Sequence, residues 1–207
     1  GLGGATLAVL SRSDFRAVNA KDSKGRTALH WATKSLPTTC TALLDRVDFA
    51  AVNAKDEGGR TALRIAMAND LEEVCEAIVS RHDFQAVNER SEDRGTLLHW
   101  AASKGNDDLC HTILGRSDFA LVDEKDALNC TALHYAAVKG LLSVCRELLR
   151  RPDFTSLRAR DIHGETAFMM SARMRTDYYR TGCEGGVGAC YEKICDALEA
   201  ALGDAVS

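Results

Sequence analysis

The sequence predicts an all-α solenoid of helix-turn-helix units with protruding finger turns. The first observation is a repeat: an Asp-Phe pair recurs from Asp14 to Asp153 at intervals of 34, 35, 35 and 35 residues. The second is that a threonine follows each pair with the same periodicity, at Thr27, Thr61, Thr96, Thr131 and Thr166. Because a unit this short cannot bury its own apolar face, each unit must pack against its neighbours.

Within one unit, two helices and a turn can be recognised. Thr27 is suited to cap a first helix whose apolar face includes Leu29 and Trp31. A second helix runs through Cys40, with Pro37 in its first turn. The stretch 48–59 lacks helical periodicity and ends in glycine, which predicts a finger turn.

The composition is that of an ordinary soluble domain. The 207 residues are 45% hydrophobic and 27% charged, with a formal net charge of -4. This mild negative charge does not favour a nucleic-acid partner, and no apolar run approaches the ~18 residues of a membrane span. We therefore expect a protein partner and a chain that is monomeric alone, while attachment to a membrane complex stays open.

The cysteines support an intracellular, reducing compartment, in the cytosol or the interior of an organelle. Five of the eight occupy one position in successive second helices, at Cys40, Cys75, Cys110, Cys145 and Cys195. We expect these thiols to be core side chains too far apart to form disulfides. Cys183 and Cys190 allow free thiols or one local disulfide, and their spacing does not suit a zinc site with His163.

The repeat divides a single domain, residues 1–207, into successive units. Residues 1–18 form a partial N-terminal unit, and four full repeats follow at 19–52, 53–87, 88–122 and 123–157, together 19–157. Residues 158–207 form an altered capping repeat with an insertion at 172–192. We expect the Gly-rich stretch 182–190 to be a loop and the last helix to cover 194–202. We also expect the numbered chain to begin inside a longer or processed protein.

The repeated motifs resemble those of ankyrin repeats. Residues 25–32, Gly-Arg-Thr-Ala-Leu-His-Trp-Ala, and 129–137, Asn-Cys-Thr-Ala-Leu-His-Tyr-Ala-Ala, are similar to the signature Gly-x-Thr-Pro-Leu-His-x-Ala-Ala. Residues 18–20 and 52–54 resemble its Val-Asn-Ala segment. The resemblance covers nearly the whole chain, and it implies a concave protein-binding surface lined by the fingers and the first helices.

Three departures from the ankyrin signature stand out. The Asp-Phe pair lengthens the usual unit of ~33 residues, in a Cys-containing form similar to repeats in proteins of unicellular algae. Arg64 and Met169 replace the signature His, so we expect altered turn bonding in those repeats. Arg94 replaces the glycine that adopts a left-handed conformation, and we expect it to mark a rearranged finger.

No pattern predicts catalysis or a cofactor. The chain lacks a phosphate loop, a Gly-x-Ser-x-Gly elbow, a His-Glu-x-x-His helix and a paired Cys-x-x-Cys. We expect His30, His99 and His134 to bond to neighbouring turn backbone rather than to act as bases or ligands. The hypothesis is therefore a protein that is not an enzyme and holds no metal.

Residues that vary between units are the candidates for partner binding, because residues that serve the stack must repeat. They lie at the finger tips and in the insertion: Lys21, Ser23, Lys24, Arg26, Lys55, Glu57, Arg60, Arg90, Glu92, Asp93, Lys125, Leu128, Arg160, Ile162, His163, Tyr178 and Tyr179. The tips change from basic to apolar along the chain, and exposed apolar tips favour a protein partner.

The predicted function is a non-enzymatic scaffold for protein–protein interaction. One alternative is a permanent accessory subunit of a larger assembly, in an organelle or attached to a membrane. Another is a regulatory or substrate-docking domain of an enzyme whose catalytic part lies outside these 207 residues.

Overall fold

The chain forms two compact units, Gly1–Ala86 (unit 1) and Val87–Ser207 (unit 2), each described here by itself. The computed structural model describes residues 8, 12, 16–34, 36–180 and 186–204. Most of the partial N-terminal unit, together with Cys183, lies outside the described residues. The expected repeat boundaries stay predictions.

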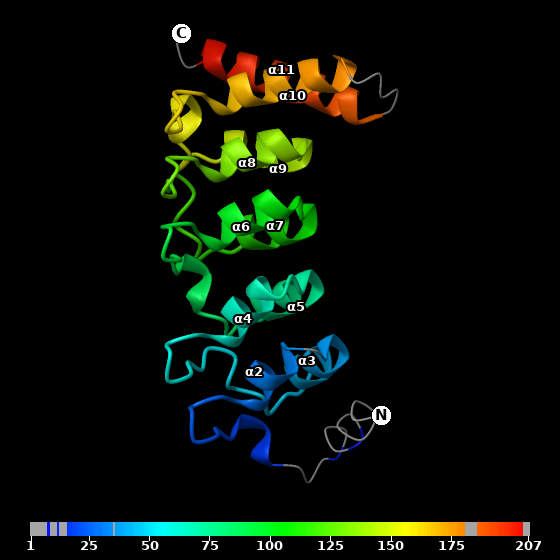
Figure 1. The fold of residues 1–207 in the computed structure, drawn as a ribbon, viewed down its shortest axis with the longest axis vertical. Helices are drawn as coiled ribbons and strands as arrows, with labels where there is room; N and C mark the ends of the chain where they lie inside the picture. The colour runs from blue at the N-terminus through cyan, green and yellow to red at the C-terminus, as the bar shows by residue number, and fades with distance from the viewer. Residues whose placement is uncertain (1–7, 9–11, 13–15, 35, 181–185, 205–207) are drawn as a thin grey trace. The chain divides into compact units, whose positions relative to one another are not determined.

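Each unit consists of layers of paired helices with finger turns on one side (Figure 1). Unit 1 contains η1 (Ala17–Asn19), α2 (Ala28–Ala32), α3 (Pro37–Leu44), α4 (Ala62–Ala68) and α5 (Glu72–Val79). At its end begins η2 (Ala86–Asn88). Unit 2 contains α6 (Leu97–Lys104), α7 (Asp107–Leu114), α8 (Ala132–Lys139), α9 (Leu142–Arg150), η3 (Ser156–Arg158), α10 (Ala167–Arg180) and α11 (Gly186–Asp204). The predicted all-α class is confirmed.

The first helix of a layer begins at the repeated threonine. The Thr27 N–H donates to Nδ1 of His30 over 3.2 Å, and α6 and α8 start in the same way. In α4 and α10 the histidine is replaced by Arg64 and Met169. The backbone N–H of each still donates to the Oγ1 of its threonine over 3.3 Å. The change expected in these two repeats is therefore confined to the side chain.

The second helices contribute the most deeply buried side chains. All five equivalent cysteines are buried, and each lies beside aliphatic residues of its own helix such as Leu43, Ile78 and Leu148. Phe49, Phe84 and Phe119 of the Asp-Phe pairs are buried as well. In these three layers the inserted pair therefore extends the apolar core, while Phe154 is half-buried.

Arg81 and Arg151, each two residues before an Asp-Phe pair, join consecutive layers within their own units, a feature that the sequence analysis missed. Arg81 donates Nε and Nη2 to the Asp83 carboxylate, each over 2.8 Å. Its guanidinium also donates to the Leu44 carbonyl and, over 2.8 Å, to the Phe49 carbonyl of the preceding layer. Arg151 repeats this arrangement with Asp153 and the Leu114 carbonyl. The Asp is retained because it orients the arginine.

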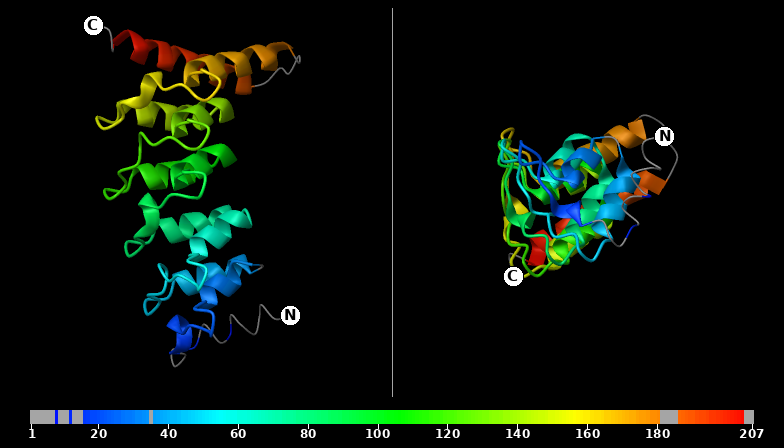
Figure 2. Two further views of the ribbon diagram at one scale, coloured as in Figure 1. Left: turned by 60° about the vertical axis from the view of Figure 1, so that its left-hand side comes forward. Right: turned by 90° about the horizontal axis from the view of Figure 1, so that it is seen from below.

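The insertion lengthens two helices. The α10 and α11 helices lie side by side and extend past α8 and α9 (Figures 1 and 2). Residues 186–190 are helical, so the expected loop over 182–190 is wrong for that part, and the last helix begins at Gly186 rather than at residue 194. The extra residues continue the helical pattern of the repeat, which lets both helices bury apolar surface against each other.

The finger containing Arg94 is not rearranged, contrary to expectation. Arg94 has a φ of 64°, close to the 72° of Gly25 and Gly59, and its N–H donates to the Ser91 carbonyl as the equivalent glycines do. The turn geometry is held by this hydrogen bond and by the Ser91 N–H to Gly95 carbonyl bond. These bonds within the finger offset the local cost of a left-handed arginine.

Candidate protein-binding surface

Four of the described fingers are turns closed by an aspartate, and Ser91 stands at that position in the finger that carries Arg94. In residues 55–60, Oδ1 of buried Asp56 accepts from the N–H groups of Gly58 and Arg60, both over 2.9 Å. These bonds and the Arg60 side chain hold the pKa of Asp56 below its ordinary value, so the carboxylate stays ionised. Asp22, Asp126 and Asp161 close their fingers in the same way. The tips are therefore rigid before any partner arrives.

Neighbouring fingers within a unit are joined through their backbones. In unit 1 the Glu57 N–H donates to the Lys24 carbonyl over 3.0 Å. In unit 2 the Ala127 N–H donates to the Asp93 backbone carbonyl over 2.7 Å, and the Ile162 N–H donates to the Leu128 carbonyl over 3.0 Å. The tip side chains of adjacent fingers are thus held next to each other.

Two of the three signature histidines, His30 and His99, connect their first helix to the following finger, as expected, whereas Nε2 of buried His134 has no hydrogen-bond partner among the described residues. Nε2 of His30 lies 3.0 Å from the Arg60 carbonyl, and Nε2 of His99 lies 3.0 Å from the Cys130 carbonyl. Since Nδ1 accepts from the threonine N–H, the ring proton must sit on Nε2. Burial lowers the pKa of His99 and His134, which favours the neutral ring. These are structural histidines.

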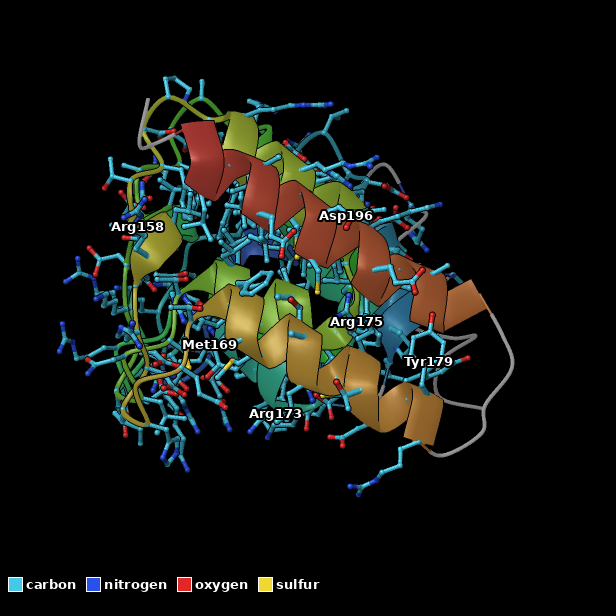
Figure 3. All side chains as sticks on the ribbon, turned by 90° about the horizontal axis from the view of Figure 1, so that it is seen from above. Arg158, Met169, Arg173, Arg175, Tyr179 and Asp196 are labelled. Atoms are coloured by element: carbon cyan, nitrogen blue, oxygen red, sulfur yellow. The ribbon has the colours of Figure 1, made fainter. Side chains whose placement is uncertain are left out.

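The structure brings two predicted contact residues together in unit 2. Leu128 and Ile162 sit on adjacent fingers and are 50% and 53% exposed. Met169, near the start of α10, is a third exposed apolar side chain in this unit (Figure 3). Tyr135, half-buried on α8, donates its hydroxyl to Asp126 over 2.5 Å and so braces the finger that carries Leu128.

Several other predicted contact residues bond within the fold. Arg26 pairs with Asp22, Arg60 with Asp56, Arg90 with Glu124, and Arg160 donates to the Gly164 carbonyl. The remaining predicted tip residues are exposed or half-buried at their fingers: Lys21, Ser23, Lys24, Lys55, Glu57, Glu92, Asp93, Lys125 and His163. The four arginines Arg26, Arg60, Arg90 and Arg160 therefore stabilise the fingers, whether or not they also contact a partner.

The two predicted tyrosines of the insertion belong to the hairpin of α10 and α11 (Figure 3). The Tyr178 and Tyr179 rings meet edge to face, with centroids 6.0 Å apart, and the Tyr179 hydroxyl donates to Glu192 over 2.8 Å. A Cβ added at Gly188 would lie 2.8 Å from the Tyr178 ring. These tyrosines fix the hairpin, and only exposed Tyr179 also offers area to a partner.

Trp31 in unit 1 is the residue that sequence reasoning assigned to packing and that the structure exposes. Its side chain is 48% exposed, and its Nε1 donates to the Asp22 carboxylate over 3.1 Å. The Arg26 guanidinium lies 4.1 Å and the Lys34 ammonium 4.4 Å from the ring centroid. The signal in the sequence was its place one helical turn before Lys34, in the unit with the most basic finger.

The described residues contain no cluster of three His, Cys, Asp or Glu side chains arranged for a metal ion. The idea of a site made of His163, Cys190 and Cys183 involves one residue outside the described part. Of the helices that the structure describes, none has the length and apolarity to cross a membrane.

Comparison with known proteins identifies the family. The family model for ankyrin repeats (3 copies) matches residues 5–90, 74–161 and 98–181, and the chain belongs to this family. The solved ankyrin repeat domain of Bcl-3, a unique member of the IkappaB protein family, matches with a TM-score of 0.53. The match covers 95% of this chain and 76% of that one at 20% identity, which shows a shared fold. No curated protein matches the chain.

Ankyrin repeats are typically non-catalytic modules of protein–protein interaction. Membership in the family therefore supports protein binding as the function of this chain.

Proposed function

We propose that the chain is a non-enzymatic scaffold that binds a partner protein through its fingers and first helices. The observation that carries the proposal is the exposed pair Leu128 and Ile162 on adjacent fingers of unit 2. Fingers elsewhere place Lys, Ser or Glu at the tips, so an apolar pair in solvent needs a reason beyond folding.

The energetics favour a small anchor on a rigid support. Fully covering a leucine or isoleucine stabilises a complex by about 1.5–3 kcal/mol relative to full exposure, and these two are already half covered. The aspartate turns at Asp126 and Asp161 hold both tips in place, so little conformational entropy is lost on binding.

Narrower forms of the proposal concern the assembly and the compartment in which the chain acts. The chain acts as a free scaffold or as an accessory subunit of a larger assembly, and we place it in a reducing compartment because seven described cysteines are free thiols. A regulatory or substrate-docking domain of an enzyme is the alternative, with catalysis outside this chain. In that case the purified chain has no turnover of its own, and an activity lost on His134→Ala would contradict both forms.

The test uses binding partners recovered from the source cell with the wild-type chain. Leu128→Ser with Ile162→Ser should weaken binding of the recovered partner by more than ~1 kcal/mol, while unfolding free energy stays within ~0.5 kcal/mol. Val47→Ser is the matched control, because Val47 is an exposed apolar residue in the turn after α3 and is not among the predicted contact residues.

The reverse outcome is equally definite. If the double variant binds normally while Lys21, Lys24 and Lys55 changed together to Glu abolish binding at physiological salt, the apolar pair is not the anchor and the proposal fails.

A further inference from the structure

Unit 1 carries its own candidate anchor, on a surface of opposite character to that of unit 2. We define the basic finger face as Lys21, Lys24, Arg26, Lys34, Lys55, Arg60 and Arg64, which come from two fingers, the turn after α2 and the helix α4. The acidic residues of these fingers are Asp22, Asp56 and Glu57.

Two of these three acids, Asp22 and Asp56, already accept hydrogen bonds within their own fingers. Asp22 accepts from Nε of Arg26 over 2.9 Å and from Nε1 of Trp31 over 3.1 Å. Burial raises the pKa of Asp22, but the bonds from Arg26, Lys24 and Trp31 hold it well below its ordinary value. Asp56 is held in the same manner by Arg60. Positive charge therefore predominates among the remaining side chains of this face.

Three acids of the helical layer in unit 1 lie on the side away from the fingers, whereas Asp70 lies in the turn that follows α4. Glu72, Glu73 and Glu76 belong to α5, and α3 and α5 lie on the side of α2 and α4 away from the fingers (Figures 1 and 2). Charges more than about 10 Å apart in solvent are largely screened at ~0.1 M salt. The finger side of unit 1 thus presents a basic surface although the chain as a whole has a net charge of -4.

Trp31 lies within this basic face. Its indole is oriented by Asp22 and flanked by two cations, yet 48% of it faces solvent. A rigid, partly exposed tryptophan is the side chain most enriched among residues that dominate binding energy. Its edge offers apolar area while Lys34 and Lys24 offer charge nearby.

We propose that the basic finger face binds an acidic segment of a protein partner. Trp31 contacts an apolar side chain of that segment, and Lys21, Lys24 and Lys34 pair with carboxylates on either side of it. A peptide fits better than a nucleic acid, because Glu57 interrupts the cations and a continuous phosphate backbone would meet its charge. The proposal rests on the proposed function only in taking the partner to be a protein, and it uses none of the unit 2 anchors.

The probe is a short Glu-rich peptide with one central Leu and no aromatic residue, titrated into the full chain. The chain has two tryptophans, so a Trp100→Phe background makes the emission report Trp31. We expect saturable binding with a change in Trp31 emission and an affinity that falls between about 50 mM and about 300 mM salt. A peptide with Ser in place of Leu should bind more weakly, and one with Lys in place of Glu should not bind.

Variants distinguish binding at the basic finger face from non-specific electrostatic binding of the acidic peptide elsewhere on the chain. Trp31→Ala, Lys24→Glu and Lys34→Glu should each weaken peptide binding roughly tenfold, with helical content unchanged by circular dichroism. Lys193→Glu, an equal charge change at an exposed position of α11, should leave binding unaltered. Leu128→Ser with Ile162→Ser should also leave it unaltered, whatever that variant does to the recovered partner.

Three results would overturn the proposal. Single-stranded oligo-dT of equal charge binding at least as tightly would assign the face to nucleic acid. Folded Trp31→Ala and Lys34→Glu with unchanged affinity would remove the face from the interaction. Loss of peptide binding in the Leu128/Ile162 variant alone would move the acidic segment to unit 2, and the proposed function would then stand without this inference.

Discussion

Arg81 stabilises the contact between two layers of unit 1 with one side chain. Its side chain is 16% exposed, and its guanidinium bonds to one carboxylate and to two backbone carbonyls of the preceding layer. Carbonyls buried between layers have no water to replace these bonds. Arg60 also pairs with an aspartate, but its side chain is 58% exposed and bonds to Asp56 of its own finger.

We expect Arg81→Leu to lower the free energy of unfolding by about 2–4 kcal/mol, because it leaves Asp83 and two carbonyls without their donor. Arg60→Ala is the control and should cost less than about 1 kcal/mol. Urea denaturation followed by circular dichroism measures both. Equal losses would mean that the contact between layers contributes nothing beyond a surface ion pair.

The buried histidines make stability depend on pH. Burial lowers the pKa of His99 and His134 in the folded chain, while in the unfolded chain they titrate near 6.5. The unfolded state therefore binds more protons as pH falls below about 6.5, so the unfolding free energy should decrease from that pH down to the folded pKa. We expect lower stability at pH ~5.5 than at pH ~7.5.

The check is denaturant unfolding at both pH values for the wild type and for His99→Gln with His134→Gln. The double variant should lose part of the difference between the two pH values, even if it is less stable at both. An unchanged difference would assign the dependence to other groups.

At the scale of elements, the hairpin of α10 and α11 replaces the short helix pair of the other layers. Both helices continue past the length that the repeat uses elsewhere, and they meet where Tyr178 packs against Gly188. Tyr191 on α11 anchors the hairpin to the neighbouring layer by donating to the Val138 carbonyl over 2.8 Å. The hairpin is therefore part of unit 2 and not an appended segment.

Gly188→Ala should destabilise this hairpin by about 1–3 kcal/mol, because the added Cβ would lie 2.8 Å from the Tyr178 ring. Gly203→Ala in the same helix is the control, since nothing lies within 4 Å of that Cβ and alanine is the better helix former. In thermal unfolding, the midpoint temperature should fall for Gly188→Ala and not for Gly203→Ala. A neutral Gly188→Ala would show that the rings move aside at no cost.

At the scale of the whole molecule, both units bury the repeated cysteines of their second helices. Cys40, Cys75, Cys110 and Cys145 come from successive second helices, and burial raises the pKa of each to about 12. The reactive thiolate is therefore scarce at neutral pH. Cys190, half-buried on α11, is the most accessible of the cysteines that the structure describes.

Alkylation of the native chain should accordingly label Cys190 first among these, and the buried cysteines together only on unfolding. Mass spectrometry of peptides from chain alkylated with and without denaturant, in the absence of reductant, gives the order. A disulfide between any two of the second-helix cysteines would contradict the stacked arrangement and the reducing compartment.

The sequence by itself determined the fold class, the helix starts at threonine, the role of the histidines and the burial of the repeated cysteines. Each follows from local or periodic chemistry, because a cap needs a residue at a fixed offset and a core position recurs with the repeat. The family followed from the same motifs, and the comparisons confirm it.

Tertiary structure alone decided which candidate residues remain on the surface. Arg26 and Arg60 differ little from Lys24 in the sequence, yet each pairs with the aspartate that closes its own finger. Trp31 and Trp100 occupy equivalent positions, but only Trp31 is exposed between two cations. Such differences depend on which groups meet across the fold, and a repeat pattern does not encode those distances.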